Sequence, residues 1–557
     1  RVSEAREIFN RLVDKNYDFT RDESINLDRE KVEYATDLRD MEERWEKKIK
    51  LELLNYLSIV KNMPEAREKL RKRYALLDRR VQEIDREQQY SMLLNSFSSA
   101  LDPHSNYLSR EEHEDFMIQT NLKLEGIGVM LKSEDGYVHV ERIIPGGAAD
   151  KLPGSLQLQP NDKIISVAQS PDAEPADVTD MDLRDVVKLI RGKKGTEVRL
   201  TILRQTSGSK EPARLVIPIV REVIKLEEQA ARSELLTVDS GGAKTRVGYL
   251  KLPSFYLDFD AAQSFDPDTR SSFRDVKNLV IDLKKKGMEA LVLDLRGNPG
   301  GALEEAVNIA GLFIDEGPIL QIKGTDRWGA RDTITVLRDN YPGKIYDGPI
   351  VVLVDKFSAS ASEILAGAIR DYGRGLIIGP TSTFGKGTVQ SYARLVEGRK
   401  GAMKVTTGIF YQPAGKSNHL FGIIPHIFVP DLSAIWDIGE DKLRYPLQWE
   451  PIRSTNFNPY KNLVTRPIIA SLAESSKRRT AQNKRFVKFV EKIDKLRREL
   501  STKVISLREE MGDKQKDLKE MEKYTQTKER KTADLENDLF LGEALNITSE
   551  YARALRH

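Results

Sequence analysis

The strongest constraint on the fold is a regular alternation of short apolar segments with amphipathic segments that begins at Val247. The apolar segments are 247–252, 290–295 and 350–354, and the segments with helical spacing are about 273–286, 302–313 and 360–372. This alternation predicts a mainly parallel sheet whose strands are joined by crossover helices. Residues 264–272 do not fit the pattern, and we expect an irregular loop there.

The other residues must form further domains, because 557 residues are too many for one hydrophobic core. Residues 1–118 are rich in charge with helical spacing of apolar residues, and residues 119–222 show the mixed pattern of a small α+β module. Residues 433–557 are expected to be helical, and the dense charges of 477–535 are typical of a solvated long helix or helical hairpin. We therefore predict a multidomain α+β protein with an α/β core at 223–432.

Composition excludes several kinds of function. Lys and Arg number 89 against 86 Asp and Glu, which is too balanced to indicate a nucleic-acid-binding protein. The absence of cysteine rules out disulfides, Cys-ligated zinc and a cysteine nucleophile, and suits the bacterial periplasm, where a thiol would be oxidised. No apolar run reaches the roughly 18–20 residues that a transmembrane helix needs. None of the six histidines has metal-site spacing, so no metal or other cofactor is expected.

A cluster of three serines follows one of the predicted core strands. The strand Val351–Val354 ends in a turn of small residues that contains Ser358, Ser360 and Ser362, and a helix is expected directly after it. A serine at such a turn is held exposed, and the free N–H groups at the start of the helix can bind a developing oxyanion. The alternative is that these serines only cap an ordinary crossover helix.

A lysine between two glycines favours the catalytic alternative. Lys386 lies between Gly385 and Gly387, shortly after the apolar strand Gly375–Gly379. Close packing at glycines removes water from the ammonium group and lowers its pKa from the usual value of about 10.4, and a neutral lysine can accept a serine proton. A phosphate-binding P-loop fits poorly, because Gly387 stands where that motif needs Ser or Thr. No histidine shares a recognisable motif with Ser360.

The glycine-rich segment 293–302 (LDLRGNPGGA) has the same strand-to-helix pattern. It can be an ordinary βα loop, or a loop that supplies a second backbone N–H beside that of Ala361. In a parallel sheet both turns lie at the carboxyl ends of strands, where the active sites of open α/β sheets form.

Together these segments resemble the carboxyl-terminal processing proteases of peptidase family S41, and especially the longer bacterial tail-specific proteases. The matching segments are 102–109 (DPHSNYLS), 125–129 (EGIGV), 294–303 (DLRGNPGGAL), 357–364 (FSASASEI), 383–390 (TFGKGTVQ) and 413–425. The resemblance implies a PDZ-like domain at 119–222 and a serine protease core at 223–432, with helical domains at 1–118 and 433–557. It further implies a periplasmic endopeptidase for proteins with apolar C-terminal tails, and a lipoprotein adaptor as a partner.

The resemblance also implies roles for single residues. Ser360, the middle serine, would be the nucleophile, Lys386 the general base and Gln390 the residue that orients the lysine, while Asp371 would have a supporting structural role. The N–H groups expected to bind the oxyanion are those of Ala361 and of either Gly300 or Gly301.

A second set of implied roles concerns the PDZ-like domain. The terminal carboxylate of a substrate would be bound by Gly126, Ile127, Gly128 and Val129. The substrate chain would then add as a strand beside Val129–Lys132.

The chain departs from the family pattern at three places. Asn161-Asp162 stands where the family has Gly-Asp, His426 stands where it has Asp, and the glycine-rich segment reads G-N-P-G-G instead of N-G-G-G. None of these changes removes a proposed catalytic side chain. A catalytically silent PDZ scaffold and a serine esterase or amidase are the alternative functions.

Overall fold

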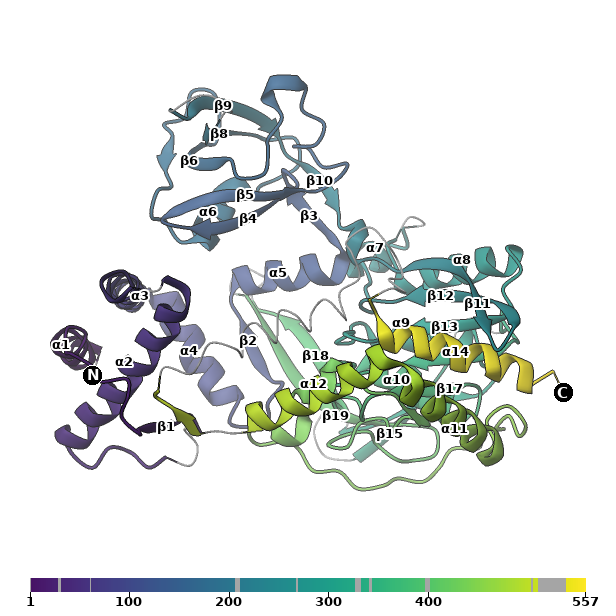
Figure 1. Cartoon of the computed structure of the whole chain (residues 1–557). Coiled ribbons are helices and arrows are strands. Elements are labelled where there is room, and N and C mark those ends of the chain that lie inside the picture. The colour runs from purple at the N-terminus through teal and green to yellow at the C-terminus, as the bar shows by residue number, and fades with distance from the viewer. Residues whose placement is uncertain are drawn as a thin grey trace. The chain divides into compact units, whose positions relative to one another are not determined.

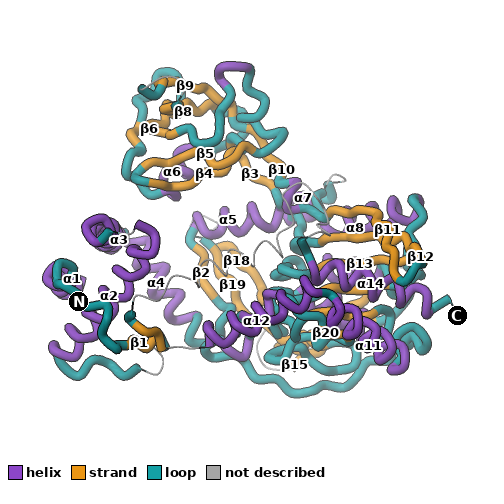
Figure 2. The backbone as a smooth tube through the Cα atoms, viewed as in Figure 1, coloured by secondary structure: helices purple, strands orange, loops and turns teal. Residues whose placement is uncertain are grey.

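The computed structural model describes residues 2–28, 32–60, 62–205, 211–266, 269–325, 332–339, 343–395, 401–501, 504–508 and 537–556. The chain forms two compact units, of which the second comprises residues 114–230 and 256–272 and the first comprises the remainder. Figures 1 and 2 show the helices and strands of both units.

The core of the first unit is a six-stranded sheet with the order β11-β12-β13-β16-β17-β20. Its strands are β11 (Arg232–Ser240), β12 (Ala243–Lys251), β13 (Ala290–Asp294), β16 (Ile350–Leu353), β17 (Leu376–Gly379) and β20 (Ile427–Phe428). Only β11 and β12 are antiparallel, so the predicted mainly parallel sheet is confirmed. The crossover helices are α8 (Ser272–Lys285), α9 (Leu303–Gly311) and α10 (Ala361–Asp371).

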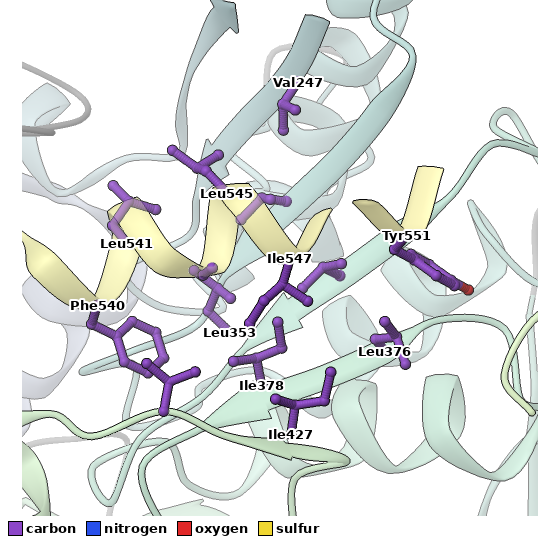
Figure 3. Packing of buried hydrophobic residues seen from close by; sticks show 14 of the residues in the cluster. Val247, Leu353, Leu376, Ile378, Ile427, Phe540, Leu541, Leu545, Ile547 and Tyr551 are labelled. Carbon is purple, nitrogen blue, oxygen red and sulfur yellow. The ribbon is translucent and has the colours of Figure 1, made fainter. Parts of the chain in front are cut away.

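One face of this sheet is covered by α14 (Leu539–Ala554), near the end of the sequence. Strands β13 and β16 are buried along their whole length, as expected for central parallel strands with both faces covered. Figure 3 shows Phe540, Leu541 and Leu545 of α14 packed with Leu353 and Ile378 of the sheet. Each such side chain contributes about 1.5–3 kcal/mol when it leaves water. The C-terminal helix is therefore part of the core of the first unit.

The first unit also contains a five-stranded antiparallel sheet that the sequence did not predict. Its strands are β2 (Asn106–Leu108), β14 (Pro318–Thr325), β15 (Asp332–Arg338), β18 (Thr388–Arg394) and β19 (Ala402–Tyr411). Helices α9 and α10 both contact β14, and β2 pairs with β19. The DPHSNYLS segment is thus brought beside the strands that follow Lys386.

The N-terminal residues form the predicted helices. These are α1 (Val2–Leu12), α2 (Leu38–Val60), α3 (Met63–Gln82) and α4 (Arg86–Ser98). A short strand between them, β1 (Ser24–Asn26), pairs antiparallel with β21 (Val504–Ser506) from the C-terminal part of the chain. Across the described residues, no helix has both the length and the apolar character needed to cross a membrane.

The C-terminal helices begin later than the sequence pattern predicted. Residues 443–465 form neither helix nor strand, and α11 (Arg466–Gln482) is the first α-helix after residue 433. Pro446, Pro451 and Pro459 explain this error, because proline lacks an N–H and restricts the residue before it. The charged segment 477–535 is helical in α11 and α12 (Lys484–Ser501), turns into β21, and lies outside the described residues at 502–503 and 509–536.

The second unit is built around an antiparallel sheet with the strand order β4-β5-β6-β8-β9. Its strands are β4 (Val129–Glu134), β5 (Tyr137–Ile143), β6 (Lys163–Ala168), β7 (Ala176–Asp177), β8 (Glu197–Arg204) and β9 (Ala213–Val220). Outside it, β3 (Lys123–Gly126) pairs with β10 (Glu222–Lys225), and the helices are α5 (Arg110–Asn121), α6 (Leu183–Ile190) and α7 (Phe259–Gln263). An irregular loop was predicted for 264–272; its described residues up to Ser271 form no helix, and α8 begins one residue early, at Ser272.

The structure gives a reason for the unusual Asn161 of the second unit. Asn161 has φ 72°, a left-handed conformation that favours glycine and that asparagine tolerates better than most residues. The next residue, Asp162, accepts hydrogen bonds from Arg204 at 2.8 and 2.6 Å. The change from glycine to asparagine therefore preserves the turn.

Candidate active site

The candidate site is built from three segments of the first unit. They are the serine turn (residues 355–360) between β16 and α10, the glycine loop (residues 296–301) between β13 and α9, and the lysine loop (residues 380–387) between β17 and β18. Because β13, β16 and β17 are neighbouring parallel strands, all three segments follow carboxyl ends of strands at the same edge of the sheet.

Ser360 has a strained backbone at the end of the serine turn. Its φ is 56° and its ψ is −114°, a combination that a residue with a Cβ rarely adopts. Helix α10 begins at the next residue, so the N–H of Ala361 is one of the orphan donors at a helix start. The turn therefore presents a hydroxyl next to a free backbone donor.

The two flanking serines have structural roles. Ser358 Oγ donates to the carbonyl oxygen of Leu295 at 2.8 Å, and Ser362 Oγ donates to that of Asn298 at 2.9 Å. The Ala359 N–H also donates to the Asn298 carbonyl, at 3.0 Å. The two flanking hydroxyls thus bind the serine turn and the start of α10 to the end of β13 and the glycine loop. This leaves Ser360 as the serine of the three for chemistry.

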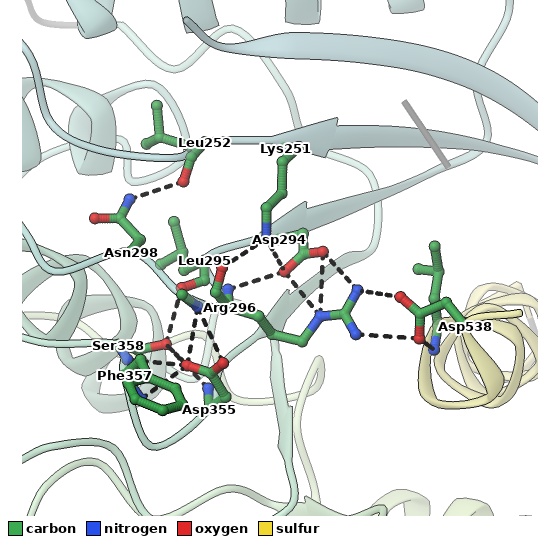
Figure 4. A network of polar contacts seen from close by, with 12 residues as sticks. Lys251, Leu252, Asp294, Leu295, Arg296, Asn298, Asp355, Phe357, Ser358 and Asp538 are labelled. Atoms are coloured by element: carbon green, nitrogen blue, oxygen red, sulfur yellow. Dashed lines mark hydrogen bonds and ion pairs between the residues drawn. The ribbon is translucent and has the colours of Figure 1, made fainter. Parts of the chain in front are cut away.

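A buried carboxylate strengthens the same connection. Asp355 accepts hydrogen bonds from the N–H groups of Gly297, Phe357 and Ser358, each at 3.0 Å (Figure 4). Burial raises the pKa of Asp355, while the bond from Gly297 opposes that shift. Asp355 was not among the predicted site residues. Its only local signal is an Asp at the end of a strand before a tight turn.

The two candidate glycines differ in what their N–H groups do. The Gly300 N–H donates to Asn298 Oδ1 at 2.9 Å, whereas the Gly301 N–H has no hydrogen-bond acceptor among the described residues. Gly300 lies against the serine turn, since a Cβ built on it would be 2.8 Å from the Cβ of Ser360 and 3.0 Å from the Ala361 nitrogen. Gly301 is the better candidate for an oxyanion donor, and Gly300 is required for close approach.

Lys386 lies in a setting that favours the neutral amine. Burial, and then the positive charge of Lys404, lower the pKa of Lys386 to about 8. Its Nζ donates to Gln390 Oε1 at 2.7 Å. Within the described residues, Nζ forms no hydrogen bond with Ser360 Oγ, so proton transfer requires Nζ to turn from Gln390 toward the serine.

Gln390 is itself oriented by two threonines. Its Nε2 donates to Thr388 Oγ1 at 2.8 Å and to Thr406 Oγ1 at 3.1 Å. The Thr406 hydroxyl in turn donates to Asp102 Oδ1 at 2.8 Å. This arrangement fixes which end of the amide faces Lys386. Thr388, Thr406 and Asp102 were not predicted as site residues, although Asp102 belongs to the matching DPHSNYLS segment.

Glu363 connects the serine turn directly to the lysine loop. Its buried carboxylate accepts hydrogen bonds from the N–H groups of Ser360 at 2.8 Å, Gly385 at 2.8 Å and Lys386 at 2.9 Å. Thr383 Oγ1 donates to the same carboxylate at 2.5 Å. Burial raises the pKa of Glu363 to about 7, and the hydrogen bonds oppose this shift. The sequence signal that was missed is the Ser-x-x-Glu pattern of a capping box.

Asp371 does not join this cluster. It ends α10, whose 11 residues place it about 15 Å from the start of the helix. Its Oδ2 accepts the N–H of Ala414 at 2.9 Å, and burial raises its pKa. A structural role for Asp371 remains a prediction.

Two histidines close to these segments have structural partners. His419 Nδ1 accepts the N–H of Gly387 at 3.1 Å, and its Nε2 lies 2.9 Å from the carbonyl oxygen of Leu447. His426 Nδ1 accepts the N–H of Ile377 at 3.0 Å, and burial lowers the pKa of His426 to about 4. Both rings are therefore poor candidates for a general base.

The predicted carboxylate-binding residues lie in the second unit. Gly126 ends β3, and Gly128 has φ 76° with its Cα so close to Gly147 that a Cβ would be 3.0 Å from the Gly147 Cα. No backbone acceptor within the described residues takes the N–H groups of Ile127 or Gly128. Val129 begins β4, an edge strand of its sheet that α6 contacts. The turn thus offers free donors beside an edge open to another strand.

Family comparisons match the chain along nearly its whole length. Peptidase family S41 matches residues 246–429, and the PDZ domain family matches residues 115–203. The tail specific protease N-terminal domain matches residues 1–111, and the C-terminal domain of tail specific protease matches residues 435–553.

Curated relatives carry names of the same kind. The chain is 33% identical over 562 residues to a tail-specific protease of Haemophilus influenzae, an alignment that covers 97% of this chain and 76% of that protein. It is 34% identical to a carboxy-terminal-processing protease of Bartonella bacilliformis, with 63% of this chain and 73% of that protein covered. Among solved structures, the photosystem II D1 C-terminal processing protease is 25% identical with a TM-score of 0.33, covering 64% of this chain and 86% of that one.

Proposed function

Because the chain belongs to peptidase family S41 and, within it, to the tail-specific proteases, we propose that it is a periplasmic endopeptidase with Ser360 as nucleophile and Lys386 as general base. The observation that carries this proposal is the carboxylate of Glu363, which accepts the backbone N–H groups of both residues. The lowered pKa of Lys386 supports its role as a base, since about a tenth of the amine is neutral at pH 7 when the pKa is about 8.

The reaction begins when neutral Lys386 Nζ takes the proton of Ser360 Oγ as that oxygen attacks the peptide carbonyl carbon. The carbonyl oxygen becomes an oxyanion and accepts the N–H groups of Ala361 and Gly301. Lys386 then gives its proton to the leaving amine, and the peptide bond breaks to leave an acyl group on Ser360. A water molecule, deprotonated by the same lysine, hydrolyses the ester and restores the enzyme.

Substrate selection is assigned to the PDZ domain. The terminal carboxylate of an apolar tail binds the free N–H groups of Ile127 and Gly128, and the tail adds as a strand to the edge of β4. The substrates are accordingly proteins with accessible C-terminal tails. The N- and C-terminal parts of the chain carry no catalytic motif and are proposed to contact the substrate or a lipoprotein adaptor.

The test is cleavage of an unstructured protein with an apolar tail, followed by mass spectrometry of the products. Ser360→Ala and Lys386→Ala should abolish cleavage, while Ser391→Ala, an exposed serine of β18 next to Gln390, should not. Full activity of either site variant would overturn the assignment.

Substrate comparisons separate the alternative functions. If the terminal carboxylate is recognised, amidation of the tail should weaken substrate binding and raise KM. Cleavage of a small ester without cleavage of the tailed protein would instead favour an esterase, and no labelling of Ser360 by a serine-directed probe would favour a silent scaffold.

A further inference from the structure

The start of the glycine loop is held by a cluster of buried charges. Asp294, at the end of β13, is fully buried and accepts hydrogen bonds from Arg296 Nη2 at 2.8 Å and from Tyr249 at 2.7 Å, with Lys251 Nζ at 3.2 Å (Figure 4). Burial raises the pKa of Asp294, but the charges of Arg296 and Lys251 outweigh it and hold that pKa below its usual range. With only these three charged groups, the cluster would carry two cations and one anion.

The second anion comes from the C-terminal part of the chain. Asp538 contacts Arg296 through two parallel hydrogen bonds, Nη2 to Oδ2 at 2.8 Å and Nη1 to Oδ1 at 3.2 Å. The Arg296 side chain is 13% exposed and that of Asp538 4% exposed, so water can replace little of this interaction. The Phe540 ring lies 4.8 Å from the same guanidinium. Asp538 therefore brings the groups in direct contact to two cations and two anions, and the buried Asp355 adds a further carboxylate whose charge acts on Lys251 and Arg296.

The cluster touches the backbone of the glycine loop directly. Lys251 Nζ donates to the carbonyl oxygen of Arg296 at 2.6 Å, and the Arg296 N–H donates to Asp294 Oδ1 at 2.9 Å. Both ends of this peptide segment are thus held by groups whose charges Asp538 balances. From Arg296 the chain runs through Gly297, bound by Asp355, to Gly300 and Gly301 beside the nucleophile.

We propose that Asp538 is a positioning residue for the oxyanion donor of the glycine loop, acting through Arg296. The inference rests on the proposed function of Ser360 and the glycine loop. Without the charge of Asp538, Asp294 is the one carboxylate left in direct contact with Arg296 and Lys251 in a region with little water, and the guanidinium loses its hydrogen bond to the charged Oδ2 of Asp538. The Arg296 backbone then shifts, and with it the N–H that binds the oxyanion.

A simpler role is that Asp538 only anchors α14. Its Oδ1 accepts the N–H of Leu541 at 2.8 Å and so caps the helix. Asparagine caps helices as well as aspartate does, so Asp538→Asn removes the charge and keeps the cap. A matched control on the same helix is Glu543→Gln. Glu543 is also buried and pairs with Arg479 at 2.7 Å, but this pair joins α14 to α11 and does not touch the glycine loop.

The experiment measures cleavage of a fluorogenic tailed peptide by the full chain, together with inhibition by a peptide aldehyde that forms a tetrahedral adduct with serine. Asp538→Asn should lower kcat about 10- to 100-fold, because complete loss of an oxyanion donor costs about 10²–10³-fold and here the donor is displaced. KM should change little, and the aldehyde should bind more weakly by a similar factor. Glu543→Gln should leave kcat and aldehyde binding near wild type.

Several results would overturn the inference. The first is an unchanged kcat in Asp538→Asn, and the second is a change in this variant that affects only KM. The third is an equal loss of kcat in Glu543→Gln, which would indicate that Asp538 serves only to dock the helix. If Asp538→Asn does not fold, two other variants are compared: Asp538→Glu, which keeps the charge, and Asp538→Ser, which keeps only the helix cap. Asp538→Glu must retain more activity than Asp538→Ser, and equal activities would refute the proposal. If the Ser360→Ala variant cleaves the peptide as fast as the wild-type protein, the proposed function itself is refuted.

Discussion

Replacing Glu363 with glutamine is a severe test of the site, although the two side chains have the same shape. The groups that form hydrogen bonds with this carboxylate are donors, because an ionised carboxylate can only accept; the Thr383 hydroxyl, which accepts the N–H of Ile423 at 2.6 Å, donates its own proton to Glu363. One oxygen takes the N–H groups of Ser360 and Lys386, and the other takes the hydroxyl of Thr383 and the N–H of Gly385. Whichever way a glutamine amide turns, its NH2 group meets two donors.

The magnitude follows from these contacts. Above about pH 8, where a carboxylate with a pKa of about 7 is charged, two hydrogen bonds to a charged acceptor are lost, each worth about 1.5–3 kcal/mol. Glu363→Gln should therefore lower the free energy of unfolding by about 3–6 kcal/mol, a large part of the about 5–15 kcal/mol typical of a domain. It should lower kcat/KM by more than about 100-fold, because the serine turn and the lysine loop lose their shared partner.

Urea unfolding and peptide cleavage check these two expectations. The matched control is Glu305→Gln in α9, a buried carboxylate that accepts the N–H of Phe273 at 2.6 Å. This variant should lose stability without a comparable loss of kcat/KM in the folded enzyme. The reasoning is refuted if Glu363→Gln keeps both its stability and its kcat/KM within about threefold of wild type, since the carboxylate would then not hold the loops.

Three further predictions follow from the site. Only neutral Lys386 can accept a proton, and burial lowers the pKa of this lysine to about 8. The value of kcat/KM should therefore rise with pH to a plateau, with an apparent pKa near 8. A flat profile from about pH 6 to 9 would exclude Lys386 as the base. Gln390→Glu places an anion beside the ammonium and should move this rise to higher pH, measured by the same profile. Ser362→Ala removes the bond to the Asn298 carbonyl and should lower kcat about tenfold while a serine-directed probe still labels Ser360; an unchanged kcat would contradict the structural role.

The sequence was informative where chemistry depends on neighbouring residues. Ser360 and Lys386 could be predicted because a strand, a small-residue turn and a helix start are all visible within a few positions. The flanking serines could not be interpreted in the same way, since their acceptors, Leu295 and Asn298, are more than 60 residues away. The sequence also left Gly300 and Gly301 equivalent, because the hydrogen bond that occupies one N–H depends on the side-chain orientation of Asn298.

Contacts between residues far apart in the sequence gave no periodic signal in it. Asp538 lies 242 residues from Arg296, just beyond the segment 477–535 whose charges predicted only a solvated long helix or helical hairpin. The antiparallel sheet was missed because β14 and β19 are separated by about 80 residues with strands and helices of the other sheet between them. The prolines of 443–465 are visible in the sequence, but the prediction of a helical region at 433–557 took no account of them.

The orientation of Gln390 shows how such distant contacts act on the chemistry. Thr406 donates its proton to Asp102, so its oxygen can only accept from Gln390 Nε2, and this leaves Oε1 as the group that faces Lys386. An amide turned the other way would present two N–H groups to the ammonium and repel it. The DPHSNYLS segment, which β2 pairs to β19, therefore helps to determine where Lys386 lies before the proposed transfer of the serine proton. The same logic applies to Asp538: residues remote in sequence hold backbone and amide groups in the one orientation that the proposed reaction needs.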